Sequence, residues 1–128
     1  MKLPAAVGLA VALCALATCS PGAEVTIVVQ RSALAGFRHY EAKAVWREVK
    51  PGDPPQLVRE PDNPYDRNAV RVEWRGRKLG YLPRSDNGAV SRQLDYGAPL
   101  AARVARVKEN RNRSVRLELE ILASLDAK

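Results

Sequence analysis

Apolar and charged residues alternate without interruption along two segments of this chain. Val70, Val72 and Trp74 are separated by charged residues, and the same period of two recurs over residues 115–121. This period indicates β-strands with one buried face, because successive side chains of a strand point to opposite sides. Other apolar stretches end at proline, glycine or asparagine, which favour turns. The expected strands are residues 25–29, 40–49, 56–60, 70–74, 78–82, 101–107 and 115–121.

One helix is expected between two of these strands. It begins near Asn87, with Ser85 or Asp86 as the capping residue, and ends near Tyr96, just before Gly97. Serine and aspartate accept hydrogen bonds from free N–H groups at the start of a helix, and glycine commonly follows its end. Six to seven short strands with one short helix predict a mainly β fold, a small antiparallel barrel of the SH3 or OB type.

The N-terminal segment over residues 1–23 has the organisation of a secretory signal peptide. Lys2 gives a short basic start, residues 3–17 are apolar and uncharged, and small or turn-forming residues follow. The apolar run is shorter than the ~20 residues of a membrane-spanning helix. Two alternatives stay open: lipid attachment at Cys19, and an uncleaved anchor or a misassigned start. We expect a leader over residues 1–23, disordered or helical if uncleaved, and an exported domain over residues 24–128.

Cysteine content and charge narrow the chemistry of residues 24–128. Both cysteines, Cys14 and Cys19, lie in the leader, so the domain has none to form a disulfide or to join His39, the single histidine, in a zinc site. We therefore expect no metal and no cofactor. Loss of Lys2 with the leader lowers the formal net charge from +7 to +6. A basic domain can attract phosphates or anionic surfaces, but the same charge also fits an ordinary basic surface.

Residues 60–70 form a polar loop that contains no glycine and is longer than a hairpin connection needs. Two prolines fix its backbone, and its aspartates and asparagines favour turns by bonding nearby backbone groups. Tyr65 and Asp66 are thereby held in a stiff frame, as in many binding loops. The acids of the loop could hold a hard cation, but they lack the spacing of an EF-hand, so turn stabilisation is the favoured interpretation.

Rings and charges meet in three short segments, residues 38–40, 63–66 and 80–84. Single-stranded nucleic acid is bound by this mixture, since bases stack on flat rings while cations follow the backbone. A carboxylate repels phosphate, so Asp66 fits such a site only by accepting a hydrogen bond from a hydroxyl, such as a terminal sugar hydroxyl. The alternative interpretation is that the tyrosines are half-buried barrel residues with hydrated hydroxyl groups.

Three segments resemble the HIRAN domain family in sequence, order and spacing. They are Gly-Phe-Arg-His-Tyr at 36–40, Leu-Val-Arg-Glu-Pro-Asp-Asn-Pro-Tyr-Asp-Arg-Asn-Ala-Val at 57–70, and Gly-Tyr-Leu-Pro at 80–83. The resemblance covers roughly residues 24–122. Members are small β-barrels, standalone in bacteria or fused to helicase-like ATPases and other modules of DNA processing and repair. The resemblance implies binding of single-stranded DNA at 3′-hydroxyl ends.

The resemblance also implies roles for individual residues. Tyr65 would stack on a terminal base, and Asp66 would accept a hydrogen bond from the 3′-hydroxyl. Asn63 and Arg38 would line the pocket for this end, and Arg84 would contact a backbone phosphate.

Two positions depart from the family pattern. His39 takes the place of a second stacking tyrosine, and Tyr81 takes the place of a histidine. Imidazole offers less stacking area than a phenol ring, which predicts weaker binding. Zinc binding and anhydride hydrolysis would belong to larger proteins that carry the domain, because this chain has neither the zinc ligands nor a phosphate loop.

The leader and the motif favour different functions. The first hypothesis is a non-catalytic module that binds single-stranded DNA, preferentially at 3′ ends. The second is an exported envelope module that binds a peptide, a glycan or an anionic polymer, because an exported protein rarely meets genomic DNA. An enzyme is the least supported, since no Gly-x-Ser-x-Gly turn or phosphate-binding glycine loop occurs. A cytoplasmic location would remove the second hypothesis and indicate a misassigned start.

Overall fold

The computed structural model describes residues 25–125 of the 128-residue chain. The expected leader over residues 1–23, with Cys14 and Cys19, lies outside the described residues. In chain order the elements are β1 (Thr26–Ala33), α1 (Ala42–Val45), β2 (Gln56–Arg59), β3 (Val70–Trp74), β4 (Arg77–Tyr81), α2 (Asn87–Asp95), β5 (Leu100–Glu109) and β6 (Val115–Ser124). Within this part of the chain, no helix is long and apolar enough to cross a membrane.

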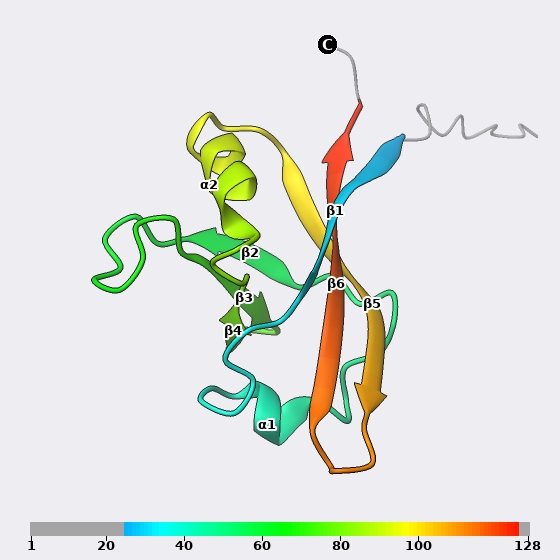
Figure 1. Ribbon diagram of the computed structural model, residues 1–128. Helices are drawn as coiled ribbons and strands as arrows, with labels where there is room; N and C mark the ends of the chain where they lie inside the picture. The colour runs from blue at the N-terminus through cyan, green and yellow to red at the C-terminus, as the bar shows by residue number, and fades with distance from the viewer. Residues whose placement is uncertain (1–24, 126–128) are drawn as a thin grey trace, which may run out of the picture.

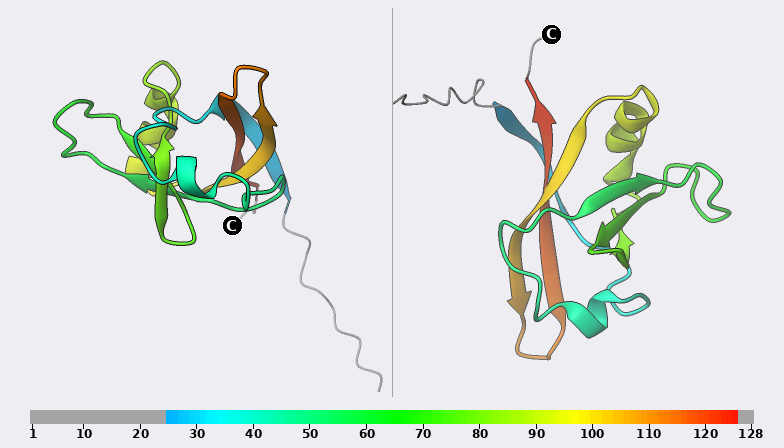
Figure 2. Two further views of the ribbon diagram at one scale, coloured as in Figure 1. Left: turned by 90° about the horizontal axis from the view of Figure 1, so that it is seen from below. Right: turned by 180° about the vertical axis from the view of Figure 1, so that it is seen from behind.

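Six strands form two antiparallel sheets of three strands each (Figure 1). One sheet has the order β1-β6-β5 and the other the order β2-β3-β4. Figure 2 shows the long strands of the first sheet beside the shorter second sheet, with α1 near the end where the β5–β6 hairpin turns. The predicted fold class, mainly β with an SH3- or OB-like arrangement and a short helix near Asn87–Tyr96, is confirmed, and the four-residue helix α1 is an addition to it.

The two sheets are not closed into a full barrel. Among the described residues no strand ladder joins them, and one isolated bridge links Ala35, just after β1, to Tyr81 of β4. The preceding residue, Leu34, donates its backbone N–H to Leu117 of β6 at 2.8 Å, while Ala35 donates to Tyr81 at 2.8 Å. The chain therefore changes from one sheet to the other within two residues and fixes their relation at this corner.

The predicted strand over residues 40–49 is wrong. Residues 42–45 form the short helix α1, and the surrounding residues are turns. The buried positions are Ala42, Val45 and Val49, at helical spacings of three and four. The strand prediction placed Ala42, Ala44 and Trp46 on one face at a period of two, in a segment whose residues favour strands. Here burial of a helical stripe outweighs that local preference.

The predicted helix near Asn87–Tyr96 is confirmed as α2, Asn87–Asp95. Asp86 occupies the N-cap position but its side chain makes no capping hydrogen bond, so that detail of the prediction is wrong. At the other end Gly97 adopts a φ of +83°. Gly97 N–H donates to Leu94 O and Ala98 N–H donates to Gln93 O, and these are the two hydrogen bonds of a Schellman motif. Glycine therefore ends this helix as expected.

The core lies between the two sheets and is closed at one end by α1. The alternating apolar residues of β3 and β6 point inward, as their period of two predicted. Burial of each large aliphatic side chain contributes about 1.5–3 kcal/mol. The buried residues that form this cluster include Val45, Val70, Val72, Leu79, Leu82, Val104, Leu117, Leu119 and Ile121.

Candidate functional site

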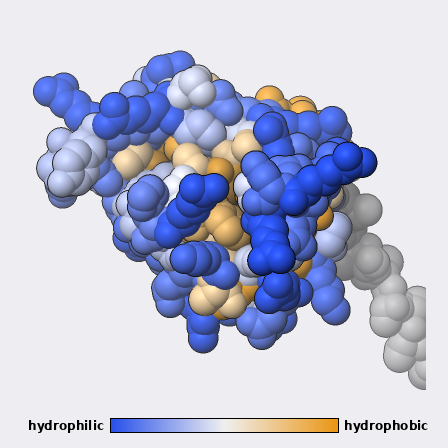
Figure 3. All heavy atoms as spheres, turned by 60° about the horizontal axis from the view of Figure 1, so that its bottom comes forward, coloured by the Kyte–Doolittle hydropathy of each residue, from blue (hydrophilic) through white to orange (hydrophobic). Residues whose placement is uncertain are grey.

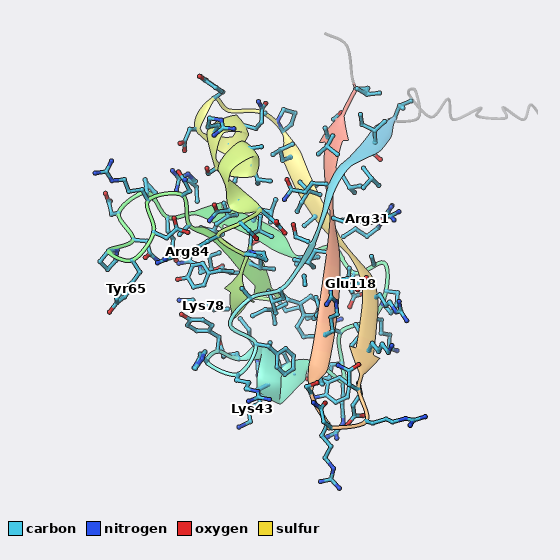
Figure 4. The ribbon with its side chains drawn as sticks, in the orientation of Figure 1. Arg31, Lys43, Tyr65, Lys78, Arg84 and Glu118 are labelled. Carbon is cyan, nitrogen blue, oxygen red and sulfur yellow. The ribbon has the colours of Figure 1, made fainter. Side chains whose placement is uncertain are left out.

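A pocket of about 290 Å³ lies between the turn after β1, the loop before β3 and the end of β4. We call it the tyrosine pocket, because Tyr40, Tyr65 and Tyr81 all line it. In Figure 4, Tyr65, Lys78 and Arg84 lie on the same side of the molecule. The pocket brings together six of the seven predicted site residues, namely His39, Asn63, Tyr65, Asp66, Tyr81 and Arg84.

Asn63 fixes the shape of the loop that presents Tyr65 and Asp66. Its side-chain Oδ1 accepts hydrogen bonds from the backbone N–H of Tyr65 at 2.8 Å and of Asp66 at 3.2 Å. Its Nδ2 donates to Glu60 Oε1 at 3.0 Å. A side chain that satisfies two backbone donors and one carboxylate stabilises a loop without regular structure. The expected stiffness of this loop therefore has a specific source, and Asn63 acts first as its frame.

Glu60 joins this loop to the second sheet. Its carboxylate accepts the Tyr81 hydroxyl at 2.8 Å and lies 2.5 Å from Arg71 Nη1. Burial raises the pKa of Glu60, but the hydrogen bonds from Asn63, Tyr81 and Arg71 outweigh it and hold the pKa below its ordinary value. Burial also raises the pKa of Tyr81. The phenol therefore keeps its proton at neutral pH, and its O–H donates a hydrogen bond to Glu60.

The Asp66 carboxylate is held by hydrogen bonds on both of its oxygens. Oδ1 accepts from the backbone N–H of Asn68 at 2.9 Å, and Oδ2 accepts from Asn87 Nδ2 at 2.7 Å. Asn87 is almost completely buried at the start of α2, so it is a rigid partner. Each carboxylate oxygen has two lone pairs and can accept a further hydrogen bond. The partly exposed Asp66 therefore presents an oriented acceptor at the pocket.

Tyr65 is free to contact a ligand. Its side chain is 81% exposed. The backbone beneath it is fixed by Asn63 and by Arg84, which donates to the Tyr65 carbonyl oxygen. The interpretation of the tyrosines as half-buried residues thus holds for Tyr81 and does not hold for Tyr65. An exposed ring on a fixed backbone offers a stacking surface at low cost in conformational entropy.

Tyr40 and Tyr81 form one wall of the tyrosine pocket, and Lys78 packs against both of their rings. The two rings meet edge to face with centroids 5.5 Å apart. Lys78 Nζ lies 4.2 Å from the Tyr40 centroid and 4.6 Å from the Tyr81 centroid, so its charge is held by both rings. His39 is adjacent, with its ring centroid 6.5 Å from that of Tyr40. The wall is therefore aromatic and carries a positive charge.

A β-bulge explains why Lys78 and Tyr81 lie on one face. In a regular strand, residues three apart point to opposite sides. The register shifts here, since Val72 pairs with Gly80 whereas Glu73 pairs with Lys78, and Leu79 is the extra residue. Bulges redirect side chains and are common beside binding sites. Sequence reasoning missed Lys78, because a plain period of two gives no sign of the bulge.

Arg38 is the predicted site residue that does not line the tyrosine pocket. It lines a second hollow of about 500 Å³ together with Lys43, Trp46, Arg47 and Arg113. The turn after β1 therefore sends Arg38 to one side and His39 to the other. Asn87 was also missed as a site residue, since its contact with Asp66 joins positions 21 residues apart.

No group of three or more histidine, cysteine, aspartate or glutamate side chains within residues 25–125 is arranged to hold a metal ion. The acids of the loop instead accept hydrogen bonds. Asp66 and Glu60 bind backbone or side-chain donors, as the turn-stabilising interpretation expected.

Comparison with known proteins is consistent with this geometry. The sequence profile of the HIRAN domain matches residues 27–126. A crystal structure of a protein from Lactobacillus plantarum has a TM-score of 0.69 and 25% identity, covering 80% of this chain and 98% of that one. The crystal structure of the HIRAN domain of human HLTF has a TM-score of 0.57 and 23% identity, covering 78% of this chain and 81% of that one.

An NMR structure of the human HLTF HIRAN domain has a TM-score of 0.53 and 23% identity, covering 78% of this chain and 80% of that one. At this identity the two HLTF structures bear on the fold alone. The search of curated proteins found no match.

Proposed function

This chain belongs to the HIRAN domain family, and from that premise we propose that it is a non-catalytic module that binds single-stranded DNA at 3′-hydroxyl ends. The terminal nucleotide would occupy the tyrosine pocket. Binding would position the end without breaking or forming a covalent bond.

The pairing of an exposed ring with an oriented carboxylate is the observation that carries this proposal. Tyr65 offers a flat, exposed face, and base stacking on such a ring stabilises a complex by about 1–3 kcal/mol. Asp66 follows it directly and can accept a hydrogen bond from a hydroxyl, whereas it repels a phosphate. A terminal 3′-hydroxyl satisfies both residues, while an internal phosphodiester satisfies only the ring.

Arg84 and the neighbouring Lys78 would then meet the phosphate on the 5′ side of the terminal nucleotide. Arg84 lines the pocket beside Tyr65, and Lys78 is held over the rings of Tyr40 and Tyr81. Charge-assisted hydrogen bonds to phosphate are stronger than those between neutral groups. The proposed site therefore has a cation for a phosphate and an anion for a hydroxyl, which together set the direction of the strand.

Replacement of Tyr65 tests the stacking contact. We expect Tyr65→Ala to weaken binding of a 3′-hydroxyl oligonucleotide by about 1–3 kcal/mol, measured by fluorescence anisotropy. Its melting temperature should stay unchanged, because the ring is exposed. Tyr96→Ala is the matched control, since Tyr96 is equally exposed at 81% but lies at the end of α2, away from the pocket. Equal loss in both variants, or loss in neither, would contradict the proposed contact.

The role of Asp66 is tested with two oligonucleotides that differ only at the end. The protein should prefer a 3′-hydroxyl over a 3′-phosphate, because a hydrogen bond to a charged acceptor contributes about 1.5–3 kcal/mol and the phosphate repels the carboxylate. Asp66→Asn should remove most of this preference, with little loss of affinity for the phosphorylated oligonucleotide. Equal binding of both ends by the unmodified protein would remove the claim of end recognition, even if single-stranded DNA still binds.

A further inference from the structure

A second hollow lies beside the tyrosine pocket, between the turn after β1, α1 and the β5–β6 hairpin. We call it the tryptophan groove, because the half-buried Trp46 lies among its lining residues. Figure 3 brings the lower end of the molecule forward and shows apolar surface with hydrophilic side chains projecting around it. At about 500 Å³ the groove is larger than the tyrosine pocket.

Positive charge dominates this groove. Arg38, Lys43, Arg47 and Arg113 line it, against the single acid Glu109. The six ion pairs found among the described residues involve none of these four cations. Unpaired cations gathered around a concave surface raise the local concentration of anions. Arg59 and Arg71 of the second sheet are in contrast paired with carboxylates.

The floor of the groove is apolar and partly aromatic. Phe37, Trp46 and Val115 line it, and the guanidinium of Arg47 lies 5.0 Å from the Trp46 ring centroid. The cations alone would be enough to bind the phosphate group of a small metabolite. A polynucleotide also carries sugars and bases, which pack on aromatic and apolar surface between the phosphate contacts. The combination of four cations with this floor favours a nucleic-acid strand over an isolated phosphate group.

One turn separates the groove from the tyrosine pocket. His39 lines the pocket and Arg38, the residue before it, lines the groove. In the view of Figure 4, Arg84, Lys78 and Lys43 follow one another down the same side of the molecule. The pocket itself, at about 290 Å³, is at the small end of ligand sites. It suits the end of a strand, so the rest of a bound strand must lie elsewhere.

We propose that the tryptophan groove binds the same DNA strand on the 5′ side of the end held in the tyrosine pocket. Phosphates would lie against Lys43, Arg113 and Arg38, and a sugar or base against Trp46. This inference rests on the proposed function and adds a path for the strand. It also gives Arg38 a place outside the end pocket. A long strand would therefore contact both the tyrosine pocket and the tryptophan groove, whereas a very short strand would contact the tyrosine pocket alone.

The test uses two oligonucleotides with 3′-hydroxyl ends. One has about three nucleotides, and the other has about ten, a length within the range of site sizes for OB folds. We expect Lys43→Gln/Arg113→Gln to weaken binding of the long oligonucleotide and to leave the short one unchanged. For the long one, the slope of log K against log salt should become shallower by about 1.4, since each phosphate contact on a single strand contributes about 0.7. Neither side chain makes a hydrogen bond or ion pair in the structure, so folding should be unaffected.

The matched control is Arg92→Gln/Arg106→Gln, which removes the same charge from two exposed arginines that line neither site. An equal change of slope in the two double variants would contradict binding in the groove and would indicate a general effect of charge. Equal affinity of the unmodified protein for the short and long oligonucleotides would overturn binding in the groove as well. Equal binding of the short oligonucleotide and its 3′-phosphate form would instead contradict the proposed function, so the two failures are distinguishable.

Discussion

A glycine at position 80 allows the chain to close the corner beside the tyrosine pocket. A Cβ atom on Gly80 would lie 2.3 Å from the carbonyl oxygen of Ala35. That oxygen cannot move away freely, because it accepts the backbone N–H of Tyr81 at 3.0 Å. The requirement comes from the close approach of two backbones, and it fixes the position of Tyr81 in the wall.

We expect Gly80→Ala to destabilise the protein by about 1–3 kcal/mol, as for other changes that overpack a closely fitted site. Gly88→Ala is the matched control and should have the opposite sign. Gly88 lies inside α2 with its nearest neighbour, the end of Arg92, at 3.5 Å, so alanine fits there. Alanine in a helix is more stable than glycine by about 0.5–1 kcal/mol. Denaturant unfolding of both variants measures the difference, and destabilisation by both would contradict this account.

Single residues of the site were predictable where their chemistry is local. Tyr65 and Asp66 follow two prolines and an asparagine within one short segment, and that spacing alone predicts a stiff loop that displays them. Lys78, Asn87 and Arg38 were not predictable in the same way. Their positions depend on a bulge, a contact across 21 residues and the direction of a turn. None of these leaves a pattern in the sequence around the residue.

At the scale of elements, the loop before β3 is attached to the second sheet through Glu60. The carboxylate binds Asn63 within the loop, Arg71 on β3 and Tyr81 on β4. One side chain therefore connects three segments that line or support the tyrosine pocket. Its side chain is 20% exposed, so solvent screens these contacts only in part.

The lowered pKa of Glu60 predicts a pH dependence of stability. The group binds its proton less readily in the folded state than in the unfolded one, so its contribution is present above its ordinary pKa of 4.5 and is lost as pH falls through the lower folded value. Glu60→Gln should therefore destabilise the protein at neutral pH and flatten the loss of stability below pH 4.5. Unfolding measured over a pH series gives the difference between the two proteins. Parallel curves would show that Glu60 does not contribute.

The unmodified protein is the reference for this comparison because Glu120 acts in the same pH range. Hydrogen bonds from Arg103, together with the nearby charge of Arg31, lower the pKa of Glu120 against a smaller effect of burial. That contribution is common to both proteins and cancels in the difference. The remaining change belongs to the connection between the loop and the sheet.

Most elements followed from periodicity, and the exception shows its limit. Strands β3 and β6 and helix α2 have one apolar face and clear turn residues at their ends, so period and boundaries agree. The segment over residues 40–49 contains Ala42, Val45 and Val49 at helical spacing among residues that favour strands. Local preference and burial disagree there, and the packing of α1 under the open end of the sheets decides the outcome. Such a conflict is resolved by tertiary contacts that a single sequence does not display.

At the scale of the whole molecule, the fold separates the core from the binding surfaces. The core lies between the sheets, whereas the tyrosine pocket and the tryptophan groove are made by turns, loops and α1 around them. Substitutions at exposed site residues should therefore change binding with little effect on folding. This separation makes the ligand tests interpretable.

Export is a property of the whole chain, and it stays a prediction because the leader lies outside the described residues. We propose that residues 1–23 direct the chain out of the cytoplasm, on the basis of their basic start and apolar run. Expressed in a bacterium with two membranes, the full chain should be recovered outside the cytoplasm with the leader removed, as shown by fractionation and mass measurement. A chain of residues 24–128 is the control and should stay in the cytoplasm.

Both forms should bind the 3′-hydroxyl oligonucleotide equally, because the core and both binding surfaces lie within residues 25–125. Recovery of the full chain at full mass in the cytoplasm would contradict export and indicate a misassigned start. Export together with selective binding of 3′ ends would mean that the strand met by this domain is DNA outside the cytoplasm. Export without such binding would favour an envelope polymer, and the four unpaired cations of the tryptophan groove would then be the surface on which an anionic polymer binds.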